Sequence, residues 1–226
     1  VADDRRKKMK KASILMAAAV LSVIVSGCAK QGGAESDREF TPTESSVYVS
    51  RDGGFSSALV ETYDKDYYDQ AELQAFLEEA VALYNGGNSG GGEESEEASG
   101  PVSLVSCTLQ DGVASSVFKY SSADDLIQFS RESGDDSNSF TFLDTAAVSD
   151  GVVKGYIVRG TFVDASGAAV KNEDITKQSK LRVICAQGGG IIQTEGKVLY
   201  MTEGVTPVDE FTVSTPDEGK SYIIFK

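Results

Sequence analysis

The chain has 226 residues, 21 Lys and Arg against 35 Asp and Glu, a formal net charge of −14, and neither histidine nor tryptophan. The acidic balance argues against nucleic acid as a partner, because nucleic-acid binding needs a basic surface. Without histidine, Ser-His and Cys-His nucleophilic catalysis is excluded, and the commonest metal ligand is missing.

Residues 1–27 have the organisation of a secretory signal peptide. Six basic residues lie between Arg5 and Lys11, and the apolar run Ile14 to Val25 follows. Twelve residues are too few for a membrane-spanning helix, which needs roughly 20. A cleaved signal is therefore favoured over an uncleaved anchor helix. This segment holds six basic and two acidic residues, so the rest of the chain carries 15 basic and 33 acidic side chains.

The signal segment ends in "VSGC", which is Val25 to Cys28. These four residues resemble the lipobox of bacterial lipoproteins: an aliphatic residue, a small residue, Gly or Ala, and then Cys. The resemblance implies that a diacylglycerol is attached to Cys28 and that a peptidase cleaves between Gly27 and Cys28. Membrane lipid would then be the partner of Cys28, on the exported face of the cell membrane. Two acyl chains are sufficient for stable anchoring.

Residues 28–46 are polar and contain Gly and Pro, which predicts a disordered tether. The segment 47–85 is predicted to be a hairpin followed by a helix. Two extended runs flank Asp52-Gly53, and Asp-Gly is a strong signal for a tight hairpin.

The predicted helix of this first unit is amphipathic. Asp69 is placed to cap its start, and Asn85-Gly86 to close its end. One apolar stripe is expected to face the core. Its members are Leu73, Phe76, Leu77, Ala80, Val81 and Tyr84.

Residues 86–100 contain six glycines and four glutamates, which predicts a flexible loop. The segment 101–226 begins with the same order as the first unit: a hairpin about Asp111-Gly112, then a helix capped by Ser122. This suggests a ββα echo between the two halves. The remainder reads as strands, including a hairpin about Asp150-Gly151. The expected class is α+β, with two helices and an antiparallel sheet built from Asp-Gly hairpins.

The body of the chain is also similar to uncharacterised lipoproteins of anaerobic Gram-positive bacteria. The matching stretches are "DGGFSSALVETYDKDYYDQAEL", "YSSADDLIQF" and the closing "YIIFK". The resemblance spans most of the mature chain and implies no particular activity.

Two further cysteines, Cys107 and Cys185, alternate with apolar neighbours and are expected at inward strand positions. Two buried free thiols are the first interpretation. A disulfide is the alternative, because an exported chain permits one. No metal site is expected, since two isolated sulfurs without histidine fall short of a zinc shell.

The stretch 64–70 collects acids and aromatics. Its spacing does not fit an EF-hand loop, so capping and solvation explain the acids better than calcium does. Tyr67 and Tyr68 are expected first to pack at the hairpin–helix junction, and an exposed binding surface is the alternative. No catalytic residue, metal or cofactor is expected.

We therefore expect an exported, membrane-anchored lipoprotein whose body is a non-catalytic domain for binding or structural support at the envelope. A protein or a glycan of the envelope is the expected partner. The alternative is a lipoprotein that binds a small solute or glycan for a transporter. Hydrolysis by a pair of carboxylates is the one enzymatic route left open.

Overall fold

The structure is a computed structural model, and the part of the chain that it describes is residues 40–63, 69–88, 100–159, 161–178 and 180–226. Every described residue belongs to one compact unit, Ser36–Lys226. The predicted signal peptide with Gly27, Cys28, residues 29–39 of the predicted tether, Tyr67 and Tyr68 all lie outside the described residues.

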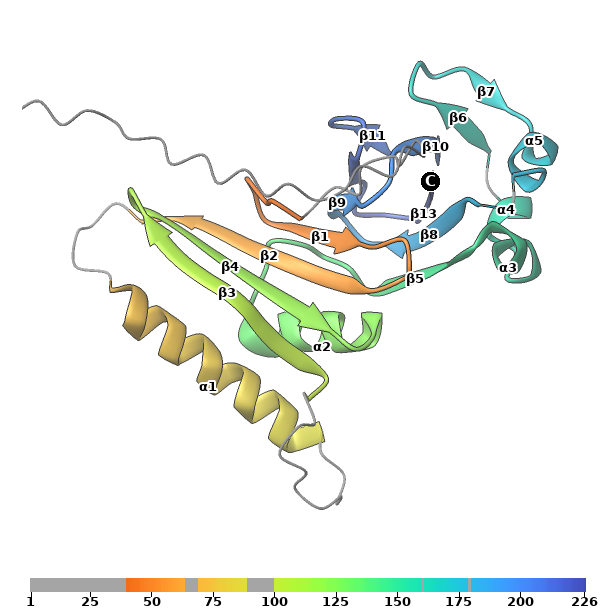
Figure 1. Ribbon diagram of the computed structural model, residues 1–226. Coiled ribbons are helices and arrows are strands. Elements are labelled where there is room, and N and C mark those ends of the chain that lie inside the picture. The colour runs from red at the N-terminus through yellow and green to blue at the C-terminus, as the bar shows by residue number, and fades with distance from the viewer. Residues whose placement is uncertain (1–39, 64–68, 89–99, 160, 179) are drawn as a thin grey trace, which may run out of the picture. The chain divides into compact units, whose positions relative to one another are not determined.

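The first sheet has seven strands in the order β11-β12-β9-β1-β2-β4-β3 (Figure 1). They are β1 (Ser46–Val49), β2 (Phe55–Thr62), β3 (Val102–Gln110), β4 (Val113–Tyr120), β9 (Gly190–Thr194), β11 (Thr206–Pro207) and β12 (Thr212–Thr215). Neighbouring strands are antiparallel except β1 and β9, which run parallel with Val47 opposite Ile192. The sheet is therefore mixed, which corrects the expected antiparallel sheet. β1 and β9 are far apart in sequence, so no local sequence pattern predicts that they pair.

The second sheet has six strands in the order β5-β8-β13-β10-β6-β7. They are β5 (Phe142–Ala147), β6 (Phe162–Asp164), β7 (Ala169–Val170), β8 (Arg182–Gln187), β10 (Val198–Thr202) and β13 (Lys220–Phe225). All its neighbouring strands are antiparallel. From β8 onward the chain passes back and forth between the two sheets.

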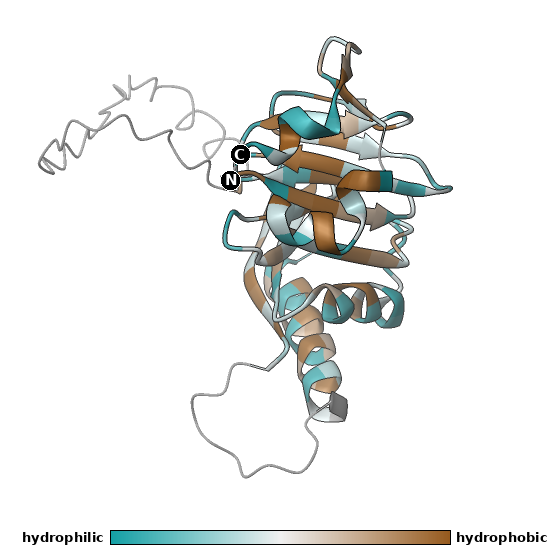
Figure 2. Ribbon diagram, turned by 90° about the vertical axis from the view of Figure 1, so that its right-hand side faces the viewer, coloured by the Kyte–Doolittle hydropathy of each residue, from teal (hydrophilic) through white to brown (hydrophobic). Residues whose placement is uncertain are grey.

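The main core lies between the two sheets. In β8, Ile184 joins a buried cluster that contains Val47 and Ile192 of the first sheet. Its neighbours Val183 and Cys185 point the other way, into a second buried cluster. β8 is thus buried on both faces, which is why its sequence is a near-continuous apolar run. Figure 2 shows apolar residues along the strands of both sheets.

Five helices complete the α+β fold among the described residues, where the sequence predicted two. They are α1 (Gln70–Asn88), α2 (Ala123–Ser133), α3 (Val148–Val153), α4 (Tyr156–Arg159) and α5 (Asn172–Thr176). The two predicted helices correspond to α1 and α2. The three short helices contribute buried residues to the second cluster and cover the outer face of the second sheet.

The hairpin expected about Asp150-Gly151 does not form, because both residues lie in α3. Gly151 is buried, and a Cβ there would lie 2.5 Å from Cγ1 of Val183 in β8. The glycine is thus needed for close approach of a helix to the sheet rather than for a turn. The strand predicted before this pair does form, as β5, but the apolar residues after it lie in α3 and α4. Ile157 is buried in the second cluster, whereas Val153 is 88% exposed.

The two earlier Asp-Gly pairs lie between antiparallel neighbours, β1 with β2 and β3 with β4. Asp111 and Gly112 have φ angles of 51° and 76°, the conformation of a type I′ turn. Gly53 has a φ of 95°. The strand–strand–helix order therefore occurs twice, as β1-β2-α1 and β3-β4-α2.

Two predicted boundaries need correction. The tether was expected to run through residue 46, but Phe40 stacks on Tyr48 with ring centroids 4.8 Å apart. Ser45 Oγ also accepts a hydrogen bond from the Val60 N–H at 2.9 Å, so the end of this segment packs on the first sheet. At the other boundary, α1 continues through Asn88, so Gly86 is helical. Residues 89–99 of the predicted loop lie outside the described residues.

Candidate functional site

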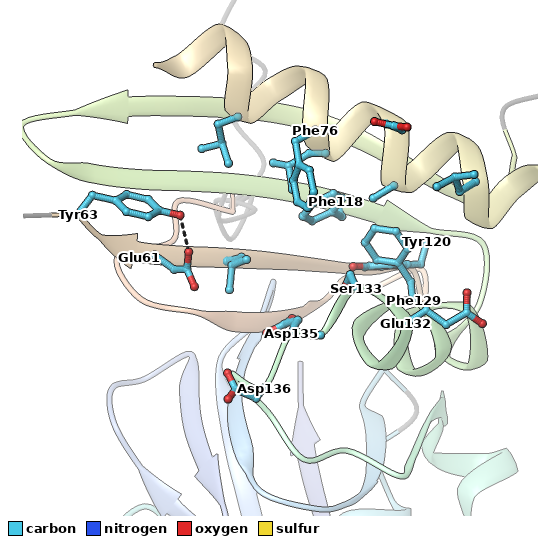
Figure 3. A pocket seen from close by; sticks show the side chains of 17 residues that line it. Glu61, Tyr63, Phe76, Phe118, Tyr120, Phe129, Glu132, Ser133, Asp135 and Asp136 are labelled. Carbon is cyan, nitrogen blue, oxygen red and sulfur yellow. Dashed lines mark hydrogen bonds between the residues drawn. The ribbon is translucent and has the colours of Figure 1, made fainter. Parts of the chain in front are cut away.

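The site lies between α1 and α2 on one face of the β2-β4-β3 part of the first sheet (Figures 1 and 3). α1 begins where the sequence predicts. Asp69 Oδ1 accepts hydrogen bonds from the N–H groups of Ala71 at 2.8 Å and Glu72 at 3.1 Å. These bonds satisfy two N–H groups that the first turn of a helix leaves unpaired, which confirms the predicted cap.

Two side-chain amides fasten α1 along the edge strand β3. Gln70 Nε2 donates to the Cys107 carbonyl, and Gln70 Oε1 accepts from the Leu109 N–H, both at 3.2 Å. Near the other end, Asn85 Nδ2 donates to the Val102 carbonyl at 2.9 Å, and Asn85 Oδ1 accepts from the Val102 N–H at 3.1 Å. The helix thereby covers an edge strand and supplies partners for its main-chain groups.

The apolar residues of α1 form two rows rather than one stripe, and polar residues alternate with them in Figure 2. Leu77 and Tyr84 are buried against the sheet and α2. Phe76 and Leu83 are 66% and 71% exposed. The expectation that Phe76 faces the core is therefore wrong. Helical periodicity places residues on a face, but it does not say which part of a broad apolar face meets the sheet.

α2 is positioned by its caps. Ser122 Oγ accepts a hydrogen bond from the Asp125 N–H at 3.1 Å, as the sequence predicts. At the other end Gly134 adopts a left-handed conformation, with φ 74°, and its N–H bonds to the Ser130 carbonyl. This turn, which is typical of helix C-termini, brings the following Asp135 to the edge of the site.

A groove with a volume of about 540 Å³ separates the two helices (Figure 3). Its apolar surface comes from β2, β4, α1 and α2. The main contributors are Leu59, Leu73, Phe76, Leu83, Phe118 and Phe129. This volume lies within the range of binding sites for small molecules and of pockets that accept a few large side chains.

Aromatic rings make the inner wall of the groove. Phe129 of α2 lies at the centre, with its ring centroid 5.2 Å from Phe118, 5.6 Å from Tyr84 and 6.1 Å from Tyr120. The Tyr120 hydroxyl is hydrogen-bonded to Ser57 Oγ at 2.8 Å. Burial raises the pKa of Tyr120 above its usual range, so this wall carries no charge at neutral pH.

The rim of the groove is acidic. Glu61 accepts a hydrogen bond from the Tyr63 hydroxyl at 2.7 Å, and four more carboxylates line the groove. None of the described lining residues is Lys or Arg. The rim therefore favours a ligand with positive charge. Its carboxylates are Glu61, Glu79, Glu132, Asp135 and Asp136.

A second group of polar residues packs over the second sheet, around Asp144. Asp144 Oδ2 accepts hydrogen bonds from the Tyr156 hydroxyl at 2.7 Å and from Lys154 Nζ at 2.5 Å. The Tyr156 ring lies 5.6 Å from that of Tyr222. Burial raises the pKa of the nearby Cys185 thiol to about 11, so the sulfur is protonated at neutral pH and is a poor nucleophile.

Cys107 and Cys185 are both buried and free, as the first interpretation expected, and they do not form the alternative disulfide. Within the described ranges, no three His, Cys, Asp or Glu residues are grouped so as to hold a metal ion. No described helix is both long and apolar enough to cross a membrane.

The sequence did not reveal the groove. Tyr63, close in sequence to the predicted Tyr67–Tyr68 surface, lines the groove, but the sequence predicts none of the other lining residues as a binding surface. Helical spacing predicts Phe76 for the core. Leu83 lies seven residues after Phe76 and outside the predicted stripe. This spacing indicates a second apolar row on the helix. No protein-family model, curated protein or solved structure matches this chain.

Proposed function

We propose that this chain is an exported lipoprotein, anchored to the cell membrane through acylated Cys28, whose folded body is a non-catalytic binding domain. The groove between α1 and α2 is its ligand site. One observation carries the proposal: the groove holds about 540 Å³ of mostly apolar space that the described residues leave open. Large exposed apolar surfaces in monomeric proteins typically mark binding sites.

The construction of the groove supports this function. It lies where the strand–strand–helix segments β1-β2-α1 and β3-β4-α2 meet, and each contributes one helical wall. We infer that the ββα echo and its Asp-Gly turns serve to place these two helices on one sheet face. The hydrogen bonds of Asn85 hold α1 on β3, and Phe129 fills the space below. A rigid, preorganised site loses less entropy when a ligand binds.

A small-solute carrier that serves a transporter is the second candidate. The volume of the groove favours it, since sites for small molecules span roughly 300 to 1,000 Å³. Tyr63 also offers a hydroxyl beside Glu61 at the rim. Both candidates bind their ligand in the same groove. The ligand of the first is a protein or a glycan of the envelope, and the ligand of the second is a small solute.

Binding of an uncharged apolar dye, N-phenyl-1-naphthylamine, to the full chain tests the binding function. We expect saturable fluorescence enhancement that the variant Ala80→Trp reduces at least about tenfold in affinity, because indole would fill the groove. Ala168→Trp, on an exposed turn, is the matched control. Leu83→Asp, at a 71% exposed position, removes apolar surface without disturbing the core and should also weaken binding. Equal dye affinity in all four proteins would refute the groove as the binding site.

A further inference from the structure

A row of apolar residues on α1 runs along the groove, parallel to the helix axis. Leu73, Phe76, Ala80 and Leu83 all line the groove and are spaced i, i+3, i+7 and i+10. At 1.5 Å per residue, this row is about 15 Å long, or nearly three helical turns. Its length is that of a short peptide helix rather than of a compact solute.

The exposure of this row is too large for a ligand that only fills the cavity. Phe76 and Leu83 stand 66% and 71% exposed beside the groove. The described part of the chain leaves most of the surface of both side chains uncovered. An apolar face with i, i+3 and i+7 spacing is the pattern that helix-in-groove recognition uses.

The charges around this row define the partner further. Glu61 and Tyr63 lie toward one end of the groove, and Glu132 lies toward the other, with Asp135 and Asp136 between them (Figure 3). A ligand that fills the groove therefore has carboxylates beside it at both ends and at the middle of the groove. An amphipathic helix with an apolar face and flanking Lys or Arg side chains complements this arrangement in shape and in charge.

We propose that the groove binds a basic amphipathic helical segment of a partner protein. The inference rests on the proposed binding function and names its ligand. The apolar face of the segment packs between α1 and α2, against Phe76 and Leu83. Its basic side chains pair with the carboxylates of the rim, including Asp135 and Asp136.

Three synthetic peptides test the inference with the full chain carrying Cys28→Ala, which prevents lipidation. The first has 15 residues, with Leu at helical i, i+3, i+4 and i+7 spacing and Lys elsewhere. The second replaces every Lys by Glu. The third keeps the Lys residues but has two central prolines, which prevent a helix. We expect the first peptide to bind at least about tenfold more tightly than either of the others.

Variants of the chain locate the binding. Phe76→Ala should weaken the Lys peptide at least about tenfold, whereas Val153→Ala, at an 88% exposed apolar position on α3, should leave it unchanged. Asp135→Asn with Asp136→Asn should weaken it about three- to tenfold and reduce its salt dependence. Glu203→Gln with Glu218→Gln removes the same charge at exposed positions outside the groove and should have no effect.

The outcomes separate the inference from the proposed function. Equal affinity for the Lys and Glu peptides, or an unchanged affinity in Phe76→Ala, would overturn the inference. If the apolar dye still binds in a way that Ala80→Trp abolishes, the groove remains a ligand site and a small solute becomes its occupant. If neither dye nor peptide depends on the groove, both proposals fail.

Discussion

The side-chain amide of Asn85 forms two hydrogen bonds with the main chain of Val102, one to its carbonyl at 2.9 Å and one from its N–H at 3.1 Å. This pair joins the C-terminal part of α1 to the first residue of β3. Val102 is 1% exposed, so water does not readily replace the amide. The groove depends on this contact because α1 is one of its walls.

Asn85→Ala should lower the free energy of unfolding by about 1–3 kcal/mol, because two buried main-chain groups lose their partner. Gln74→Ala is the control. Gln74 lies on the same helix and is exposed, and its side chain donates a hydrogen bond to Glu78 of the same helix at 2.8 Å. That variant should change stability by no more than about 0.5 kcal/mol. Urea denaturation measures both, and equal midpoints for the two variants would contradict the role of Asn85.

Two helical glycines give opposite predictions. A Cβ at Gly151 would lie 2.5 Å from Val183, so Gly151→Ala should destabilise the protein by about 1–3 kcal/mol through overpacking. A Cβ at Gly86 would meet nothing within 4 Å, so Gly86→Ala should stabilise by about 0.5–1 kcal/mol, because alanine favours a helix. Thermal melting of both variants distinguishes them. A tolerated Gly151→Ala would mean that α3 does not pack on β8.

The contrast between these glycines shows what the sequence reveals of the fold. α1 and α2 were predicted because their signals are local: Asp69 and Ser122 cap them, and apolar residues recur at helical spacing. α3 was missed because Asp150-Gly151 followed by alternating apolar residues also fits a hairpin. The choice depends on Val183, which approaches only in the folded chain. Tertiary contacts thus override a turn signal.

The groove was harder to predict than the helices for the same reason. Its walls come from four elements, and each lining residue has an ordinary role within its own element. Phe76 fits an inward helical position, and Asp135 fits a solvated loop. Only the arrangement of α1 and α2 on one sheet face shows that Phe76 borders a cavity and that Asp135 lies at its rim.

The protein should lose stability at alkaline pH. Burial raises the pKa of Tyr120 in the folded protein, so the unfolded chain releases this proton first, as the pH rises through the ordinary tyrosine pKa of about 10. Stability from this group is complete below that pH and is lost above it, by at most about 1.4 kcal/mol per pH unit. Urea denaturation between about pH 8 and about pH 12 should show a shallower alkaline loss in Tyr120→Phe than in the wild type. Identical slopes would contradict the burial of this hydroxyl.

The anchor has its own prediction. Cys28→Ala should abolish incorporation of a labelled fatty acid and leave the chain unprocessed, because the acyl acceptor of the lipobox is lost. Cys107→Ala is the matched cysteine control, since Cys107 is buried, and it should be labelled normally. Lipid labelling that persists in Cys28→Ala would show that the "VSGC" motif does not direct lipidation.

Leucine methyl NMR of the full chain, titrated with N-phenyl-1-naphthylamine, tests the central claim of a ligand groove most directly. The account predicts that the methyl signals of Leu59, Leu73 and Leu83, which line the groove, shift as the dye is added. Leu181, which is 2% exposed in the second buried cluster, should not shift. Shifts at Leu181 without shifts at Leu73 and Leu83 would place the ligand elsewhere and contradict the account.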